Sequence, residues 1–353
     1  MHRLISLMIA AALTLGLAGP AEAAAKKNFR VAWSIYVGWM PWGYAADAGI
    51  VKKWADKYGI TLDVVQINDY IESINQYTAG AFDGCVMTNM DALTIPAAGG
   101  VDSTALIVGD FSNGNDGVVL KGAKDLKAIK GRKVNLVELS VSHYLLARGL
   151  ASVGLKESDI TVVNTGDADI VAAAAASDVT AIVTWNPQLA AVKTLPDWHL
   201  VFDSSDIPGE IIDLMVVNSG TLADNPALGR ALTGIWYETV ALMAADTPAG
   251  KAAREAMAKA SGTDLEGFES QLATTKMFYA PKDAAAFARD PALERTMDHV
   301  RQFSFSHGLL GEGAKSADAV GISFADGKTL GDPARVKLRF TDAWMQQAAD
   351  GEL

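Results

Sequence analysis

The segment FRVAWSIYVGWMPWGYAADAGIVKKWADKYGITLDVVQ, Phe29 to Gln66, contains two β-rich runs separated by a helical pattern. The runs Phe29–Ile35 and Thr61–Gln66 are rich in β-branched and aromatic residues, whereas Ala45–Tyr58 has helical periodicity. A strand–helix–strand unit of this kind predicts a parallel sheet that is covered by helices.

An aromatic turn joins the first run to the helix. Trp39, Trp42 and Tyr44 stand there among glycine and proline residues. Large aromatic side chains are usually buried, whereas glycine and proline mark turns near the surface. Two interpretations follow: the aromatic residues pack under the loop as core, or they line a cavity that a ligand fills.

The alternation of strands and helices continues through the first two thirds of the chain. Further strands are predicted at Cys85–Thr88, Thr104–Gly109, Lys133–Val137, Ile160–Asn164, Thr180–Thr184, His199–Phe202 and Leu214–Val217, and further helices at Tyr70–Ala79, Ser142–Val153 and Asp169–Ser177. After Leu222 the residues Ala, Met, Lys and Glu dominate, which predicts a mostly helical C-terminal part. The fold class is therefore α/β with mostly parallel sheets.

Two segments are typical of passages between domains, namely Gly109–Gly117 and Pro208–Gly220. We therefore expect lobe 1 to comprise residues 24–112 and 217–353, and lobe 2 to comprise residues 113–216. Two lobes joined by two hinge crossovers form a clamshell, which binds its ligand in the cleft at the carboxyl ends of the strands.

Charge and the N-terminal segment narrow the function classes. The chain has 41 acidic and 30 basic residues in 353, a formal net charge of −11, which argues against nucleic acid as a partner. Residues 1–23 have a basic start, an apolar run and the small-residue site Ala21-Glu22-Ala23, as expected of a cleaved signal peptide. The apolar run is too short to span a bilayer.

Cysteine usage adds to the expectation of a freely soluble periplasmic or secreted protein. The segment before the cleavage site contains no cysteine, so we expect no lipid anchor. Cys85 is the single cysteine, which excludes an internal disulfide, and its strand context favours a small core residue over a reactive thiol.

Signatures of catalysis and of metal binding are missing from the sequence. There is no G-x-S-x-G elbow, and the five histidines have no metal-ligand spacing on a helix. We therefore predict that the protein binds no metal and no cofactor and is not an enzyme.

The loops that follow the predicted strands are acidic. They contain Asp69, Asp91, Asp110, Asp116, Glu138, Asp167, Asp169, Glu210 and Asp213, with no Lys and no Arg. Helix capping and solvated turns explain many of these acids. They do not explain the absence of basic residues, because an anion site would be expected to offer Arg, Lys or helix N-termini. Aromatic faces and carboxylates together favour a planar cation.

Three stretches resemble the periplasmic solute-binding proteins of nitrate/sulfonate/taurine-type ABC transporters. They are the opening segment extended to Asp69, YTAGAFDGCVMTNMDAL (residues 77–93) and DLKAIKGRKVNLVELSVSHYLLARGLASVGLKESDITVVN (residues 125–164). Within that family, the sequence is most similar to the branch found beside urea-carboxylase genes, a neighbourhood associated with urea and guanidine. The resemblance implies a type II clamshell, capture outside the cytoplasm, and delivery to a membrane permease with a cytoplasmic ATPase.

The resemblance and the acidic loops together suggest a set of ligand-binding residues. They are Trp39, Trp42, Thr88, Asn89, Asp91, Glu138, Ser140, His143, Trp185 and Asp213. Trp185 is expected to close on the ligand from lobe 2, whereas Glu138 and Asp91 are expected to select a cation, guanidinium foremost. For Glu138 the alternative is capping of the helix near Ser142.

Other ligands and classes stay open at this point. The alternative ligands are urea, another small amine, a pyrimidine precursor, or an anion such as taurine or nitrate. A sensor domain would have the same sequence features as a transport component. An enzyme of related fold that forms a pyrimidine precursor uses a cysteine-rich motif, and the single cysteine of this chain argues against that class.

Overall fold

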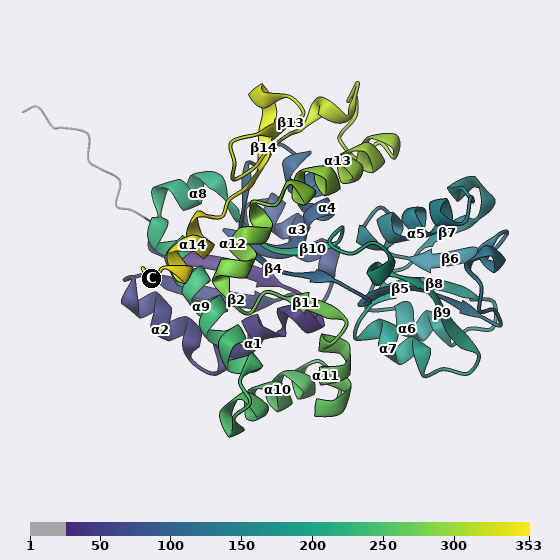
Figure 1. Cartoon of the computed structure of the whole chain (residues 1–353), viewed down its shortest axis with the longest axis horizontal. Helices are drawn as coiled ribbons and strands as arrows, with labels where there is room; N and C mark the ends of the chain where they lie inside the picture. The colour runs from purple at the N-terminus through teal and green to yellow at the C-terminus, as the bar shows by residue number, and fades with distance from the viewer. Residues whose placement is uncertain (1–25) are drawn as a thin grey trace, which may run out of the picture.

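The computed structural model describes residues 26–353 of the chain. The predicted signal peptide, residues 1–23, lies outside the described residues. The described chain forms two lobes, each built on its own β-sheet, which lie side by side in Figure 1. Within residues 26–353, no helix combines the length and the apolar character needed to cross a membrane.

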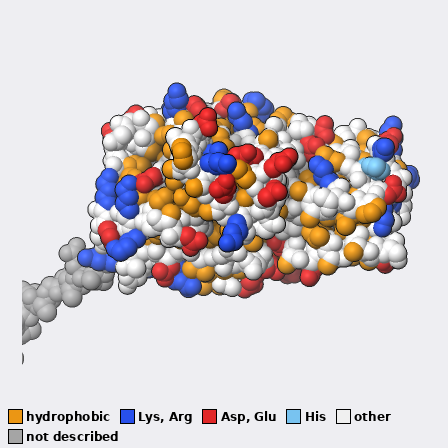
Figure 2. Space-filling view, turned by 90° about the horizontal axis from the view of Figure 1, so that it is seen from below, with side chains coloured by type: hydrophobic (Ala, Val, Ile, Leu, Met, Phe, Trp, Pro, Cys, Tyr) orange, Lys and Arg blue, Asp and Glu red, His pale blue; other side chains and the backbone are white. Residues whose placement is uncertain are grey.

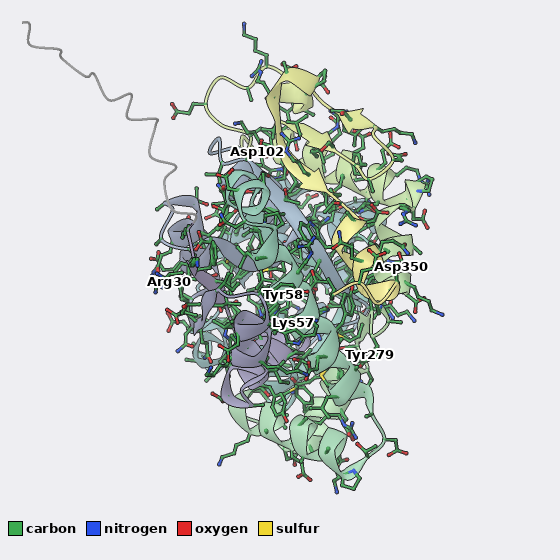
Figure 3. All side chains as sticks on the ribbon, turned by 90° about the vertical axis from the view of Figure 1, so that its left-hand side faces the viewer. Arg30, Lys57, Tyr58, Asp102, Tyr279 and Asp350 are labelled. Atoms are coloured by element: carbon green, nitrogen blue, oxygen red, sulfur yellow. The ribbon has the colours of Figure 1, made fainter. Side chains whose placement is uncertain are left out.

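The first lobe is built on a nine-stranded sheet with the order β13-β12-β14-β4-β10-β3-β1-β2, in which β11 also pairs with β4. Its strands are β1 (Asn28–Trp33), β2 (Thr61–Gln66), β3 (Gly84–Thr88), β4 (Ser103–Ser112), β10 (Ile212–Asn218), β11 (Thr275–Met277), β12 (Gly321–Ser323), β13 (Thr329–Leu330) and β14 (Val336–Phe340). Both ends of the described chain contribute to this sheet. Arg339 on β14 donates two hydrogen bonds to Asp102, which precedes β4 and is labelled in Figure 3.

The second lobe is built on a five-stranded sheet with the order β7-β6-β8-β5-β9. Its strands are β5 (Asp116–Lys121), β6 (Lys133–Leu136), β7 (Thr161–Asn164), β8 (Ala181–Trp185) and β9 (Trp198–Asp203). The chain passes between the sheets twice, between Ser112 and Asp116 and between Asp203 and Ile212. The expected boundary at residues 216/217 falls inside β10, all of which pairs in the first sheet.

Helices cover both sheets (Figure 1). They are α1 (Met40–Asp47), α2 (Ile50–Lys57), α3 (Tyr70–Thr78), α4 (Asn89–Ala92), α5 (Val141–Ser152), α6 (Ile170–Ala174), α7 (Gln188–Lys193), α8 (Ser219–Asp224), α9 (Pro226–Ala244), α10 (Pro248–Ala260), α11 (Leu265–Leu272), α12 (Pro281–Ala288), α13 (Pro291–Ser306) and α14 (Ala343–Ala349). Short 3-10 turns precede α1 (η1, Val37–Trp39) and follow α5 (η4, Glu157–Asp159).

The α/β class is confirmed, but the expectation of mostly parallel sheets is wrong. β10 runs antiparallel to both β3 and β4, and β5 runs antiparallel to both β8 and β9. Each of these strands lies at a passage between the lobes, so it enters its sheet against the direction of its neighbours. Both sheets are therefore mixed.

Three local features also differ from expectation. The helix expected over Ala45–Tyr58 is two helices, because Gly49 adopts the left-handed conformation (φ 76°) between α1 and α2. Strand β5 was not predicted, and its first two residues, Asp116 and Gly117, lay in the expected crossing. The C-terminal part contains the strands β11 to β14 besides its helices, and runs of two to five residues are too short to be recognised by their periodicity.

The core confirms the sequence-based expectation for Cys85. Cys85 is fully buried and has no disulfide partner, and burial raises the pKa of its thiol to about 12. Trp54 packs against α9, where a Cβ on Gly234 would lie only 2.4 Å from its ring. Its indole N–H donates to Glu238 at 2.7 Å.

Candidate ligand-binding site

A small cavity lies between the two lobes and is lined from both. Its lining residues are Tyr36, Trp39, Tyr70, Thr88, Ile211 and Asp213 from the first lobe and its connection, and Asp116, Val141 and Trp185 from the second. The cavity volume is about 20 Å³, which leaves room for only one or two water-sized spheres. The cavity therefore suits a ligand of only a few heavy atoms.

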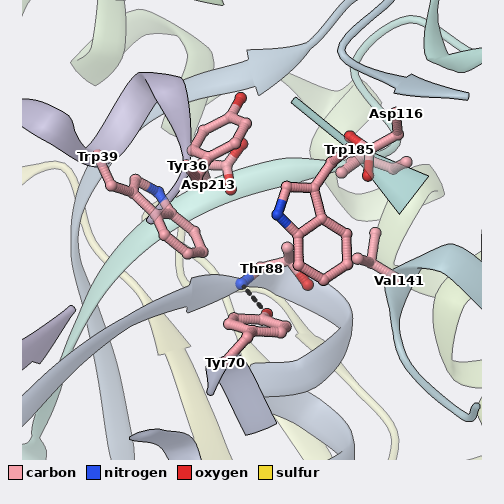
Figure 4. A pocket seen from close by; sticks show the side chains of 9 residues that line it. Tyr36, Trp39, Tyr70, Thr88, Asp116, Val141, Trp185 and Asp213 are labelled. Atoms are coloured by element: carbon pink, nitrogen blue, oxygen red, sulfur yellow. Dashed lines mark hydrogen bonds between the residues drawn. The ribbon is translucent and has the colours of Figure 1, made fainter. Parts of the chain in front are cut away.

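Four aromatic rings form much of the wall. Tyr36 and Trp39 meet edge to face at 5.0 Å between ring centroids, and Trp39 lies 5.7 Å from Tyr70. Tyr70 in turn lies 5.7 Å from Trp185, which comes from the second lobe. In Figure 4, Trp39 and Trp185 lie on opposite sides of the cavity, with Tyr70 below them. Such an arrangement of rings is typical of sites that bind cations over aromatic faces.

Glycine and proline residues determine how the aromatic turn after β1 packs. Pro41 occupies the first turn of α1, where its missing N–H costs no hydrogen bond. A Cβ on Gly38 would lie 2.5 Å from the ring of Tyr36 and 2.7 Å from Asp110 Oδ2. Glycine at position 38 therefore allows Tyr36 and Asp110 to pack closely at the end of the sheet.

Four buried carboxyl groups surround the cavity. Asp116 and Asp213 line it directly, and each is only 3% exposed. Asp91 and Asp110 are fully buried behind the wall. Each of these two carries an oxygen that has no hydrogen-bond partner among the described residues, Asp91 Oδ1 and Asp110 Oδ2.

The hydroxyl groups of the wall donate their protons to these carboxylates. Tyr36 donates to Asp110 Oδ1 at 3.0 Å, and Tyr70 donates to Asp91 Oδ2 at 2.6 Å. Thr88 Oγ1 also donates to Asp91 Oδ2, at 2.8 Å. Because each hydroxyl has one proton, the lone pairs that remain on these oxygens can accept hydrogen bonds from a ligand.

Burial dominates the electrostatics of the carboxyl groups. It raises the pKa of Asp91 to about 6 and that of Asp116 to about 7. Burial, with the neighbouring carboxylates, also raises the pKa values of Asp110 and Asp213. No Lys, Arg or His is among the residues that line the cavity. The site therefore offers acceptors and negative charge, which favours a cationic hydrogen-bond donor.

The structure brings four of the expected residues to the cavity wall, namely Trp39, Thr88, Trp185 and Asp213. Asp91 lies directly behind Thr88 and Tyr70. The other expected residues lie elsewhere.

Trp42 and Asn89 belong to the packed interior. Trp42 stacks on Trp236, with ring centroids 5.3 Å apart. Asn89 accepts a hydrogen bond from the backbone of Ile212 and donates one to the carbonyl of Glu210, so its amide holds the second crossing.

Glu138 and Ser140 do not reach the cavity either. The Glu138 side chain is exposed, and only its backbone N–H is engaged, with Asn164. Glu138 does not cap α5, because Ser140 is the N-cap residue and accepts from the Ser142 N–H. The expectation that Glu138 lies in the cleft is thus corrected.

His143 faces a different contact between the lobes. Its ring, together with Glu157 and His307, forms a cluster in which the nitrogen and oxygen atoms that could bind a metal lie within 4.8 Å of one another. The backbone N–H of Leu139 donates to His143 Nδ1 at 3.1 Å, so Nε2 carries the ring proton in the neutral form. A metal ligand would need that proton on Nδ1, so this arrangement suits a hydrogen-bonded contact better than a metal centre.

Sequence reasoning missed four polar residues of the site, Tyr36, Tyr70, Asp110 and Asp116, besides the apolar lining residues Val141 and Ile211. Both aspartates belonged to the acidic loops but were not selected among them. Their position at the two ends of the first crossing, after β4 and before β5, is the signal that could have found them.

Comparison with known proteins settles the family. Residues 32–261 match the NMT1-like family. The chain belongs to this family. A curated Brucella abortus (strain 2308) protein named as a binding protein is 26% identical to this NMT1-like chain over 203 residues. The match covers 56% of this chain and 62% of that relative, which is less than two thirds of its length.

Solved structures with the same fold come from periplasmic binding proteins. The alkanesulfonate-binding protein of Xanthomonas axonopodis pv. citri, bound to MOPS, has a TM-score of 0.67 at 17% identity and covers 84% of this chain and 99% of its own. The nitrate-binding protein of Synechocystis PCC 6803 has a TM-score of 0.57 at 13% identity and covers 93% and 99%. This NMT1-like chain therefore has the two-lobed periplasmic binding protein fold.

Proposed function

We propose that this chain is the solute-binding component of an ABC import system. It captures a small planar nitrogenous cation, guanidinium, between its lobes outside the cytoplasm and delivers it to a membrane permease that works with a cytoplasmic ATPase. Family membership and the two-lobed fold support the transport role. A role in binding alone, without catalysis, fits a cavity that is lined by aromatic rings and carboxyl groups.

The buried carboxyl groups around an aromatic-walled cavity carry the choice of ligand. Guanidinium has a positive charge, a planar face and only N–H donors. Its face can stack on Trp39 or Trp185, at about 0.5–2 kcal/mol per contact. Its N–H groups can donate to Asp116, to Asp213 and to the hydroxyl oxygens of the wall.

The same features argue against an anionic ligand. A sulfonate or nitrate ion would enter a cavity with four buried carboxyl groups around it and no basic side chain in its lining. The ligands of the structurally similar sulfonate- and nitrate-binding proteins are therefore not transferred to this chain.

Charged side chains of both signs are interspersed on the face shown in Figure 2, and that face has no broad basic patch for nucleic acid.

Urea is the second candidate ligand, because the cavity wall contains one unpaired hydrogen-bond donor. The indole Nε1 of Trp39 is buried and has no hydrogen-bond partner among the described residues. The urea oxygen could accept from it, whereas guanidinium has no acceptor. Urea would leave the carboxylates without a counter-charge, so guanidinium satisfies more of the site.

Calorimetric titration of the mature protein with guanidinium chloride, urea, taurine and nitrate tests the proposal. We expect guanidinium to bind at least tenfold more tightly than urea, a difference of about 1.4 kcal/mol or more. We expect no heat of binding from taurine or nitrate. Tighter binding of either anion would overturn the cation assignment, and tighter binding of urea would replace the ligand within the same site.

A further inference from the structure

Asp110 and Asp213 face each other on neighbouring strands at the cavity. In the antiparallel pairing of β10 with β4, Asp213 stands directly opposite Asp110. Residues in this relation have Cβ atoms about 4.5–5.5 Å apart and project from the same face of the sheet. Asp110 is fully buried and Asp213 is 3% exposed, so the two carboxyl groups form a buried pair.

Among the described residues, no basic group acts on this pair to balance its charge. The titratable groups that act on it are Tyr36 before η1, Asp116 on β5 and Tyr279 after β11. Thr275 on β11 adds a hydroxyl that bonds to Tyr36. Its neighbour Lys276 pairs with Phe111 in the ladder and has an exposed side chain.

Two carboxylates this close in a buried site do not both ionise, since each destabilises the charge of the other. Burial and the mutual repulsion of the pair raise the pKa of Asp213 well above its ordinary value. Asp213 lines the cavity and Asp110 lies behind it, and a proton held by one of these carboxyl groups can form a hydrogen bond to the other. The empty site therefore holds a proton in this pair at neutral pH.

We propose that binding of the cation expels this proton, so that the site exchanges one positive charge for another. The inference rests on the proposed function, because it takes guanidinium as the ligand. In the exchange, the O–H bond of the protonated carboxyl group breaks and its electron pair stays on the carboxylate. The proton passes to water and the buffer, and the guanidinium N–H groups take its place without any change of oxidation state.

Titration of guanidinium chloride into the whole mature protein, in buffers of different ionisation enthalpy, measures the exchange. Phosphate, HEPES and Tris at about pH 8 are suitable, because Asp91 and Asp116 are then mostly ionised and contribute few protons. We expect the observed binding enthalpy to change linearly with the ionisation enthalpy of the buffer, with a slope of about one proton released per guanidinium bound.

Two variants assign the proton. Asp110→Asn should reduce the slope to well below one proton while guanidinium still binds, because it removes the repulsion from Asp110 that helps to keep Asp213 protonated in the empty protein. Asp116→Asn is the matched control and should keep the slope near one proton, although it binds more weakly. A thermal melt of each variant shows that it is folded.

The possible failures are distinguishable. No heat of guanidinium binding in any buffer would contradict the proposed function itself. Binding with the same enthalpy in all three buffers would overturn the proton exchange and leave the ligand assignment intact. A slope that survives Asp110→Asn but disappears in Asp116→Asn would place the proton on Asp116 and overturn the role of the pair.

Discussion

His307 Nε2 lies 2.8 Å from Glu157 Oε1, and this contact joins the two lobes at a distance from the cavity. His307 follows α13 in the first lobe, whereas Glu157 begins η4 in the second. His307 Nδ1 lies 2.8 Å from the carbonyl oxygen of Phe303. Both ring nitrogens thus face oxygen atoms that can accept a hydrogen bond. Contacts with His143 and His307 lower the pKa of Glu157.

Removal of this contact should favour separation of the lobes. We expect Glu157→Gln and His307→Ala each to weaken guanidinium binding by about fivefold, which corresponds to about 1 kcal/mol for a partly exposed ion pair. Small-angle scattering at a subsaturating ligand concentration should show a larger mean radius of gyration than for the parent. His199→Ala is the control, because the His199 side chain pairs with Asp197 in the same lobe. Equal affinities of all three variants would show that the contact does not influence closure.

Asp116 and Glu138 give a direct test of which carboxylates select the ligand. Asp116→Asn should weaken guanidinium binding by roughly tenfold to a hundredfold, since a hydrogen bond to a charged group contributes about 1.5–3 kcal/mol. Glu138→Gln should bind like the parent, because the Glu138 side chain is exposed and lies outside the cavity. Calorimetry measures both. The reverse result would return the selecting role to the loop before α5.

Trp185 should contribute to affinity through its aromatic face. We expect Trp185→Ala to weaken guanidinium binding by about 2- to 30-fold, the equivalent of about 0.5–2 kcal/mol for a contact between a cation and a ring. Trp185→Phe should retain part of the affinity. Trp42→Phe is the control, since Trp42 stacks on Trp236 in the core. A loss in Trp42→Phe as large as that in Trp185→Ala would contradict the cavity seen here.

The raised pKa values of the aspartates predict how stability depends on pH. In the folded protein Asp91 titrates at about 6 and Asp116 at about 7, both above their values in the unfolded chain. Between about pH 4 and pH 7 the folded state therefore binds more protons than the unfolded state, so stability falls as the pH rises. Thermal melts of the ligand-free protein should show this decrease. It should be smaller in Asp116→Asn, and a melting temperature that rises with pH over this interval would contradict the burial of these groups.

Guanidinium binding should have the opposite dependence. Because ionised carboxylates attract the cation, affinity should rise from about pH 5 to about pH 8 as Asp91 and Asp116 lose their protons. Calorimetric titration at several pH values measures this trend. A constant affinity over the interval would mean that these carboxyl groups do not contact or influence the ligand.

The sequence predicts the charge of the site better than it predicts which residues line the cavity. The absence of Lys and Arg from the loops after the strands corresponds to a cavity lined without basic residues. Asp110 and Asp116 could not be singled out from sequence, since their proximity to Asp213 depends on the pairing of β4 with β10 and on the passage to β5. The contact of His143 with His307 joins two lobes, and no local pattern indicates it.

Because both lobes enclose the cavity, their opening controls how long a ligand stays bound. Trp39 and Tyr70 come from one lobe and Trp185 from the other, so a bound molecule is covered on opposite sides. It cannot diffuse away until the lobes part, and the frequency of that opening sets an upper limit on the dissociation rate. The residence time therefore depends on the hinge and on the contacts that span it. Different ligands that fit the cavity have the same upper limit on their dissociation rate.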